Sequence, residues 1–131
     1  MRVVAMIAAL IATAGCFNPT GPDAVLGTPF ALKHGETASL PENAKLRFDT
    51  VRGDSRCPID AICISAGDAT IAVTLMRNGG TESHDVHTIP AQSQFSYSKY
   101  AIKLTELQPY PRSDRQARPE DYTATFVVQN Q

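Results

Sequence analysis

The chain has 131 residues, with 12 Lys and Arg against 13 Asp and Glu side chains and a formal net charge of −1. A chain of this length folds as one domain around a single hydrophobic core. Nucleic-acid binding requires clusters of Lys and Arg; the nearest approach to one interleaves Arg112, Arg115 and Arg118 with Asp114 and Glu120, so no nucleic-acid partner is expected.

The first residues are typical of an export signal. Residues 3–14 form an apolar run that is broken only by Thr13. The run is too short to cross a bilayer, which takes about 20 residues, but it matches the hydrophobic region of a secretory signal peptide. The stretch Thr13-Ala14-Gly15-Cys16 resembles the lipobox of bacterial lipoproteins. The resemblance implies cleavage before Cys16, whose thiol would carry a diacylglycerol and anchor the protein to the membrane.

The same resemblance implies a destination. Phe17 follows the cysteine, where an Asp would signal retention at the inner membrane, so the implied location is the outer membrane, facing the periplasm. The expected organisation is a signal peptide at 1–15, the lipidated Cys16 with a Pro- and Gly-containing tether at 16–27, and a domain at 28–131. Ordinary secretion after a cut near Gly15 and retention as an uncleaved anchor are the alternatives.

Two further cysteines, Cys57 and Cys63, remain to pair with each other. An exported protein meets an oxidising compartment, in which such a pair usually closes to a disulfide. A redox or metal pair is the alternative reading. Redox motifs normally use the spacing CxxC, and zinc needs two more ligands that no nearby spacing provides. We therefore expect a structural disulfide that closes a short loop.

Apolar residues alternate with polar ones at the period of β-strands, and helical periodicity is nearly absent. The alternation predicts strands at 30–33, 37–40, 45–51, 69–76, 81–89, 97–107 and 122–129. Asn78-Gly79-Gly80 suits a tight hairpin turn, and the polar strand after it is expected at a sheet edge. The pattern predicts an all-β domain: a small antiparallel β-sandwich, immunoglobulin-like, or a small β-barrel.

The alternation also assigns inward faces. The residues expected to point at the core are Leu46, Phe48, Ala69, Ile71, Val73, Leu75, Tyr100, Ile102, Leu104, Tyr122, Ala124, Phe126 and Val128. Asp121-Tyr122 resembles the tyrosine corner of immunoglobulin-like sandwiches, in which the Tyr hydroxyl bonds across its own turn. The chain has no Trp and no cysteine pair suited to joining two sheets, so an immunoglobulin domain in the strict sense is excluded.

The most distinctive motif is Asp54-Ser55-Arg56-Cys57-Pro58, followed by Cys63 and Ala66-Gly67. Together with the strands on either side, it resembles a group of uncharacterised bacterial secreted proteins and lipoproteins. The resemblance covers residues 46–75 and extends loosely to the strands at Tyr100 and Tyr122. Many members carry a Trp where this chain reads Ile64-Ser65. The resemblance implies an exported all-β domain and supplies no catalytic residues.

The motif describes a short, closed and charged loop between two core strands. Asp54 and Ser55 favour a turn, and Arg56 can pair with Asp54, Asp60 or Asp68. Such a loop is either a structural corner or a surface that is presented to a partner. For the second case the candidate contact residues are Asp54, Arg56, Asp60 and Tyr110.

Candidate chemistry is sparse elsewhere. His84 and His87 fall on opposite faces of one strand, although His84 shares a face with Glu82 and could form a two-ligand set. Calcium-loop spacing, a GxSxG nucleophile elbow and a dinucleotide fingerprint are all absent from the sequence. Neither an enzyme nor a cofactor is expected.

The leading hypothesis is a non-enzymatic envelope lipoprotein that acts as a binding or structural module for an envelope or extracellular protein. The first alternative is an inhibitor of a secreted hydrolase, a protease or a lysozyme, which inserts the loop at 54–63 or the one at 110–118 into an active site. The second alternative is a carrier of a metal or small ligand through His84 and its neighbours.

Overall fold

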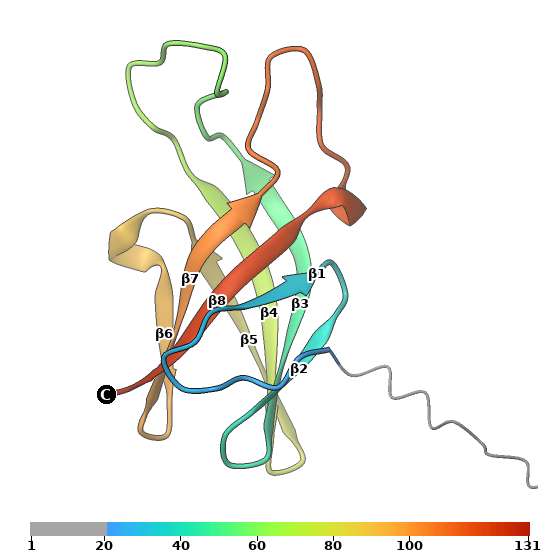
Figure 1. Ribbon diagram of the computed structural model, residues 1–131, viewed down its shortest axis with the longest axis vertical. Coiled ribbons are helices and arrows are strands. Elements are labelled where there is room, and N and C mark those ends of the chain that lie inside the picture. Colours follow the sequence, from blue (N-terminus) through green and yellow to red (C-terminus); the bar gives the residue numbers. More distant parts are fainter. Residues whose placement is uncertain (1–20) are drawn as a thin grey trace, which may run out of the picture.

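The computed structural model describes residues 21–131 as two four-stranded antiparallel sheets that enclose one core (Figure 1). One sheet contains, in spatial order, β2 (Thr37–Leu40), β3 (Ala44–Asp54), β4 (Ala69–Arg77) and β5 (Gly80–His87). The other contains β1 (Phe30–Lys33), β8 (Thr123–Asn130), β7 (Tyr100–Gln108) and β6 (Gln94–Tyr97). Two 3-10 turns, η1 (Pro90–Gln92) and η2 (Pro119–Asp121), complete the elements. The predicted all-β sandwich is confirmed.

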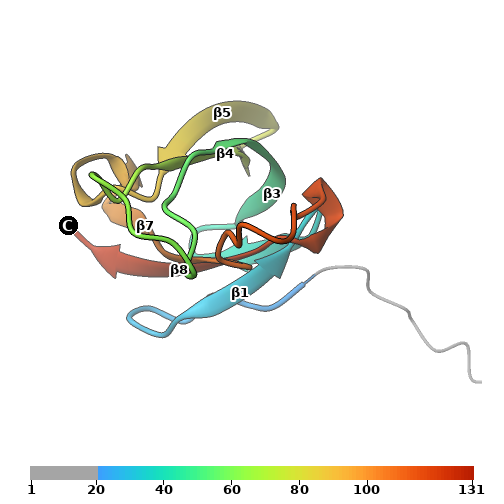
Figure 2. The same cartoon turned by 90° about the horizontal axis from the view of Figure 1, so that it is seen from above.

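The strands follow one another as a meander. Each strand from β2 to β8 pairs with a neighbour in sequence, whereas β1 pairs with β8. The sheet edges β5 and β6 lie against each other, where the His84 and Phe95 rings stack with centroids 4.2 Å apart. Seen from above, the strands surround the core as a flattened ring (Figure 2). Immunoglobulin domains use Greek-key connections, whereas the strand order of this sandwich is nearer that of an up-and-down barrel.

Alternating side chains fill the space between the sheets. The side chains that are completely buried come from both, and they include Leu46, Phe48, Ile71, Ile102 and Phe126. Burying an apolar side chain of this size contributes about 1.5–3 kcal/mol. A bulge in β7 between Leu104 and Glu106 restarts the alternation and turns Leu107 inward as well. The predicted inward faces of β3, β4, β7 and β8 are confirmed.

A hairpin replaces one predicted strand. The sequence predicts a single strand over 97–107, whereas β6 and β7 are two strands joined by a turn at Ser98 and Lys99. Ser98 takes a positive φ of 50°, which is uncommon for a residue that is neither Gly nor Asn. The strand β3 also continues to Asp54, three residues beyond its predicted end. The polar strand β5 lies at a sheet edge, as predicted.

The predicted signal peptide, the lipidated Cys16 and the first part of the tether lie outside the described residues. Within residues 21–131, no helix is long and apolar enough to cross a membrane. The described chain begins at Gly21, whose N–H donates to the carbonyl oxygen of Thr37 at the start of β2.

Candidate functional site

Two long loops rise from the same end of the domain (Figure 1). The first, the disulfide loop, comprises residues 55–68 and joins β3 to β4; the second, the proline loop, comprises residues 109–122 and joins β7 to β8. The two loops therefore belong to opposite sheets. Contacts between them include the hydrogen bond from the Ile59 N–H to the Pro111 carbonyl oxygen, with N···O 2.9 Å.

The disulfide loop is narrow at its base and closed at its tip. Cys57 and Cys63 form the predicted disulfide, with their Cα atoms 5.9 Å apart. Below it, the Cys57 N–H donates to the Ala66 carbonyl oxygen at 2.9 Å, and the Ser55 N–H donates to the Asp68 carbonyl oxygen at 2.7 Å. The two arms of the loop are thus tied together at three levels.

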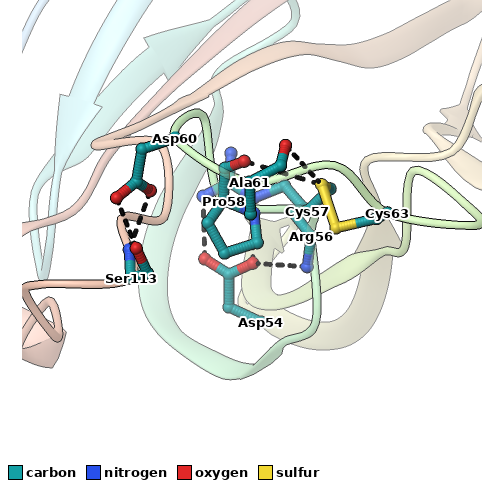
Figure 3. The surroundings of a disulfide bond; sticks show 8 residues. All are labelled: Asp54, Arg56, Cys57, Pro58, Asp60, Ala61, Cys63 and Ser113. Atoms are coloured by element: carbon teal, nitrogen blue, oxygen red, sulfur yellow. Dashed lines mark hydrogen bonds and ion pairs between the residues drawn. A yellow bond between two sulfur atoms is a disulfide. The ribbon is translucent and has the colours of Figure 1, made fainter.

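Arg56 points into the domain instead of out of the loop, and its guanidinium clasps Asp54 (Figure 3). Arg56 Nε and Nη2 donate to the two carboxylate oxygens of Asp54 at 2.9 and 2.8 Å. The same guanidinium donates to the carbonyl oxygens of Leu107 at 2.7 Å and Pro109 at 2.9 Å. The Arg56 and Asp54 side chains are only 9% and 12% exposed. This cluster therefore links the end of β3 to the end of β7 across the two sheets.

Tyr122, the last residue before β8, completes that link. Its hydroxyl donates to Asp54 Oδ2 at 3.0 Å, and burial together with this bond raises the pKa of Tyr122 to about 12. Burial by itself would raise the pKa of Asp54, but hydrogen bonds and positive charge from Arg56 outweigh it and hold that pKa below its ordinary value. The tyrosine-corner prediction is wrong, because the hydroxyl bonds to the opposite sheet and not across its own turn.

Asp60 forms a second bridge between the loops. Its carboxylate accepts hydrogen bonds from the Ser113 N–H, at 2.9 Å, and from the Ser113 hydroxyl. These bonds lower the pKa of Asp60. Asp68 is the last residue of the loop. Its Oδ1 accepts hydrogen bonds from the Thr88 N–H and hydroxyl, each at 3.1 Å, and its Oδ2 lies 2.5 Å from His87 Nδ1. The loop is fastened to its surroundings on both sides.

The outer side of the same loop is apolar. Residues 59–66 are all exposed, and Ile62 and Ile64 are completely so, with relative exposures of 104% and 109%. Ile59 is also largely exposed, and Tyr110 of the proline loop is about half exposed. Single exposed apolar residues are ordinary, but here three exposed isoleucines fall within six residues of one loop. We call Ile59, Ile62 and Ile64 the isoleucine tip.

The predicted contact residues are only partly available to a partner. Asp54 and Arg56 face inward, and the Asp60 carboxylate is held by Ser113. Tyr110 remains accessible; its hydroxyl donates to Glu106 at 3.2 Å, and its ring lies 5.3 Å from the Arg56 guanidinium carbon. Sequence reasoning missed the isoleucine tip. The available signal was three isoleucines within a Cys- and Pro-containing loop that no strand pattern includes.

A groove of about 1110 Å³ lies beneath the proline loop, lined by the end of β3 and by residues 109–119, 121 and 122. Its charged side chains are largely paired with each other: Arg112 with Asp114 at 3.0 Å and Arg118 with Asp121 at 3.2 Å. The groove therefore presents no concentrated charge of one sign.

On β5, His84 contacts a single acidic side chain, that of Glu82. His84 Nε2 lies 3.4 Å from Glu82 Oε2, on the shared face that the sequence predicts. In the described part of the chain, no three His, Cys, Asp or Glu side chains are grouped so that they could hold a metal ion.

Removal of the disulfide is expected to destabilise the protein moderately. Replacing both Cys57 and Cys63 by Ala should lower the free energy of unfolding by about 2 kcal/mol, because the covalent bond closes only a short loop in the unfolded chain. Urea unfolding of the oxidised wild type and the double variant measures the difference. Equal stabilities would show that the hydrogen bonds of the loop make the covalent bond dispensable.

A scan against protein-family models and searches of curated proteins and of solved structures found no match for this chain, so its function is inferred from the residues of the site itself.

Proposed function

We propose that this protein is a lipid-anchored binding module of a bacterial cell envelope, which docks on a partner protein through the isoleucine tip. The lipobox-like sequence that ends at Cys16 supports the anchor. The observation that carries the docking role is the complete exposure of Ile62 and Ile64 on a loop that is fastened at its base, its disulfide and its neighbouring loop. A loop whose base is already held loses less conformational entropy when a partner binds it than a flexible loop does.

The position of the tip agrees with this role. The disulfide loop lies at the upper end of the domain in Figure 1, whereas the described chain begins with a hydrogen bond from the Gly21 N–H to Thr37, at the start of β2. The described chain therefore does not begin in the loop that carries the isoleucine tip. The charged groups beneath the tip, Asp54, Arg56 and Asp60, are already occupied in internal contacts, so the proposal assigns them to support and not to catalysis.

Charges placed in the isoleucine tip should abolish binding without unfolding the domain. Ile62→Asp and Ile64→Asp should each change the free energy of unfolding by less than about 0.5 kcal/mol, as exposed substitutions do, and weaken partner binding at least about tenfold. Crosslinking in living cells, followed by recovery of the protein with whatever is attached to it, measures the binding. Val25→Asp is the control, because Val25 is 61% exposed but lies outside the loop. Equal recovery of the partner with all variants would overturn the proposal.

The anchor has its own test. The intact mass of the membrane-extracted protein should correspond to a chain that begins at Cys16 and carries acyl groups, and Cys16→Ser should remove them. A chain that begins at Met1, or beyond Cys16 without acyl mass, would contradict the anchor and leave the docking role to be judged separately.

A further inference from the structure

The first part of the described chain is built into the sandwich. Residues 21–28, here called the strap, run along β2 and then cross to β8. The Gly21 and Ala24 N–H groups donate to carbonyl oxygens of β2 at 2.6 and 2.8 Å. Further along, the Gly27 N–H donates to the Val128 carbonyl oxygen of β8, also at 2.8 Å. The strap therefore joins the two sheets, and the chain is part of the fold from Gly21 onward.

Gly21 fixes the place at which the chain joins the domain. A Cβ atom on this residue would lie 2.7 Å from the Thr37 carbonyl oxygen, so a glycine is needed for the chain to come this close to β2. Only residues 17–20 separate Cys16 from Gly21. The five Cα–Cα steps between these two residues span at most about 18 Å when the chain is fully extended. An acylated Cys16, held at the bilayer surface, would therefore keep Gly21 within about 18 Å of the membrane.

The strap lies toward the end of the sandwich that is opposite the two long loops (Figure 1). It bonds to Ser39, which pairs with Lys45 near the start of β3, whereas the disulfide loop follows Asp54 at the end of that strand. The β4 partners of Lys45 and Asp54 are Met76 and Ala69. These partners are separated along β4 by about 24 Å, at 3.4 Å per residue. The attachment of the chain and the isoleucine tip therefore belong to opposite ends of the domain.

The strap presents two apolar side chains beside this attachment. Val25 and Leu26 are 61% and 43% exposed. They begin a turn that the Thr28 N–H closes by donating to the Val25 carbonyl oxygen at 3.0 Å. Gly27, with a φ of +76°, supplies the left-handed residue of the turn, so Leu26 stands at its corner. Exposed apolar side chains next to a membrane anchor favour the boundary between lipid headgroups and acyl chains.

We propose that the Val25-Leu26 turn lies in the headgroup region of the membrane that holds Cys16, with the isoleucine tip directed away from that membrane. This inference rests on the lipid anchor of the proposed function and adds the surface that faces the bilayer. The anchor makes the contact intramolecular, so even a small apolar surface meets the membrane at a high effective concentration. Val25→Asp would loosen this contact without changing the isoleucine tip or removing the lipid, so it remains the control for docking on the partner protein.

The isoleucine tip fits the membrane less well than the turn does. Among residues 21–131, nothing hydrogen-bonds to the N–H or carbonyl groups of residues 62–65, and unsatisfied backbone groups are costly in lipid. In the turn, by contrast, the Val25 carbonyl oxygen and the Gly27 N–H are both paired within the domain. The turn is also the closer of the two to Cys16 along the chain.

Tryptophan fluorescence tests this orientation, because the chain has no Trp of its own. Leu26→Trp and Ile62→Trp each place one reporter at an exposed position of the full acylated chain, whose intact mass is checked first. The protein is incorporated into vesicles of phosphatidylethanolamine and phosphatidylglycerol that carry bromine atoms close to the headgroups, where they quench a nearby Trp. The Leu26→Trp emission should move to shorter wavelength and lose intensity, and the Ile62→Trp emission should do neither. Val25→Trp reports on the same turn if circular dichroism shows that Leu26→Trp is unfolded.

The outcomes separate this inference from the proposed function. Quenching at the turn without quenching at position 62 supports the inference. No quenching at either place overturns it and leaves docking of the isoleucine tip on a partner protein standing. Quenching at position 62, with or without quenching at the turn, overturns the inference and the docking role together, because the tip would then lie in the membrane. A chain that cells leave without acyl groups overturns the inference together with the anchor.

Discussion

Replacing Arg56 by Met is expected to lower the free energy of unfolding by about 3–5 kcal/mol, because removal of one partner from a buried ion pair leaves the other charge without compensation. Asp54 would keep only the Tyr122 hydroxyl as a side-chain donor, and the carbonyl oxygens of Leu107 and Pro109 would lose theirs. Since these groups come from both sheets, the loss should also loosen the attachment of the disulfide loop. Guanidinium unfolding followed by circular dichroism measures the change.

Arg52→Met is the matched control. Arg52 pairs with Asp85 at 2.7 Å, which is as short as the contacts of Arg56, but the two side chains are 56% and 53% exposed. Exposed pairs of this kind contribute at most about 1 kcal/mol. Similar small losses in the two variants would show that the buried pair does not hold the sheets together.

The pH dependence of the Arg56→Met effect follows from the pKa of Asp54. Arg56 holds that pKa in the folded protein below its ordinary value, so the carboxylate stabilises the fold above its unfolded pKa of about 3.9 and loses this effect as the pH falls through the folded value. The difference between wild type and Arg56→Met should therefore narrow below about pH 4. A difference that stays constant down to pH 3 would assign the effect to lost packing of the arginine stem.

The strands could be predicted where one face is buried and the other is exposed to solvent, because apolar side chains then recur at every second position. This holds for β3, β7 and β8, whose inward faces came out as expected. It fails for β6, where Gln94-Phe95-Ser96-Tyr97 is short and its turn at Ser98 carries no Gly or Asn. The order of the strands within the sheets could not be predicted either, because alternation indicates which face of a strand is buried and not which strand lies beside it.

The sequence predicted the chemical character of the loop, but not which of its side chains point inward and which point outward. Cysteine count and export context were enough for the Cys57–Cys63 disulfide. Arg56 had three aspartates nearby in sequence, and its carbonyl partners lie more than fifty residues further along the chain. No local pattern signals contacts between such distant segments. Charged residues were therefore expected on the surface of the loop, whereas the fold turns Arg56 inward and leaves the isoleucines outside.

Gly67→Ala is expected to lower the free energy of unfolding by at least about 3 kcal/mol, because two separate penalties act at this position. Gly67 has a φ of +69°, in the left-handed region that side chains with a Cβ adopt at a cost of about 1 kcal/mol. A Cβ atom there would also lie 1.9 Å from the carbonyl oxygen of Ser55 and 3.0 Å from the Cα atom of Arg56. Backbone atoms on the opposite arm of the loop would have to move, and the hydrogen bonds at the base of the loop would move with them.

Gly79→Ala isolates the first penalty from the second. Gly79 has a similar φ of +74°, but no atom lies within 4 Å of the place where its Cβ would be, so this variant should lose only about 1 kcal/mol. Urea unfolding of the two variants gives the contribution of the close approach as the difference between their losses of stability, and equal losses would mean that the Ser55 backbone moves aside without cost.

Because Ser55 precedes Arg56, the displacement should also disturb the ion pair that anchors the loop. A Gly67→Ala protein that is folded at low temperature should therefore bind its partner more weakly than a Gly79→Ala protein, and equal binding would show that the isoleucine tip does not depend on the fixed base beneath it.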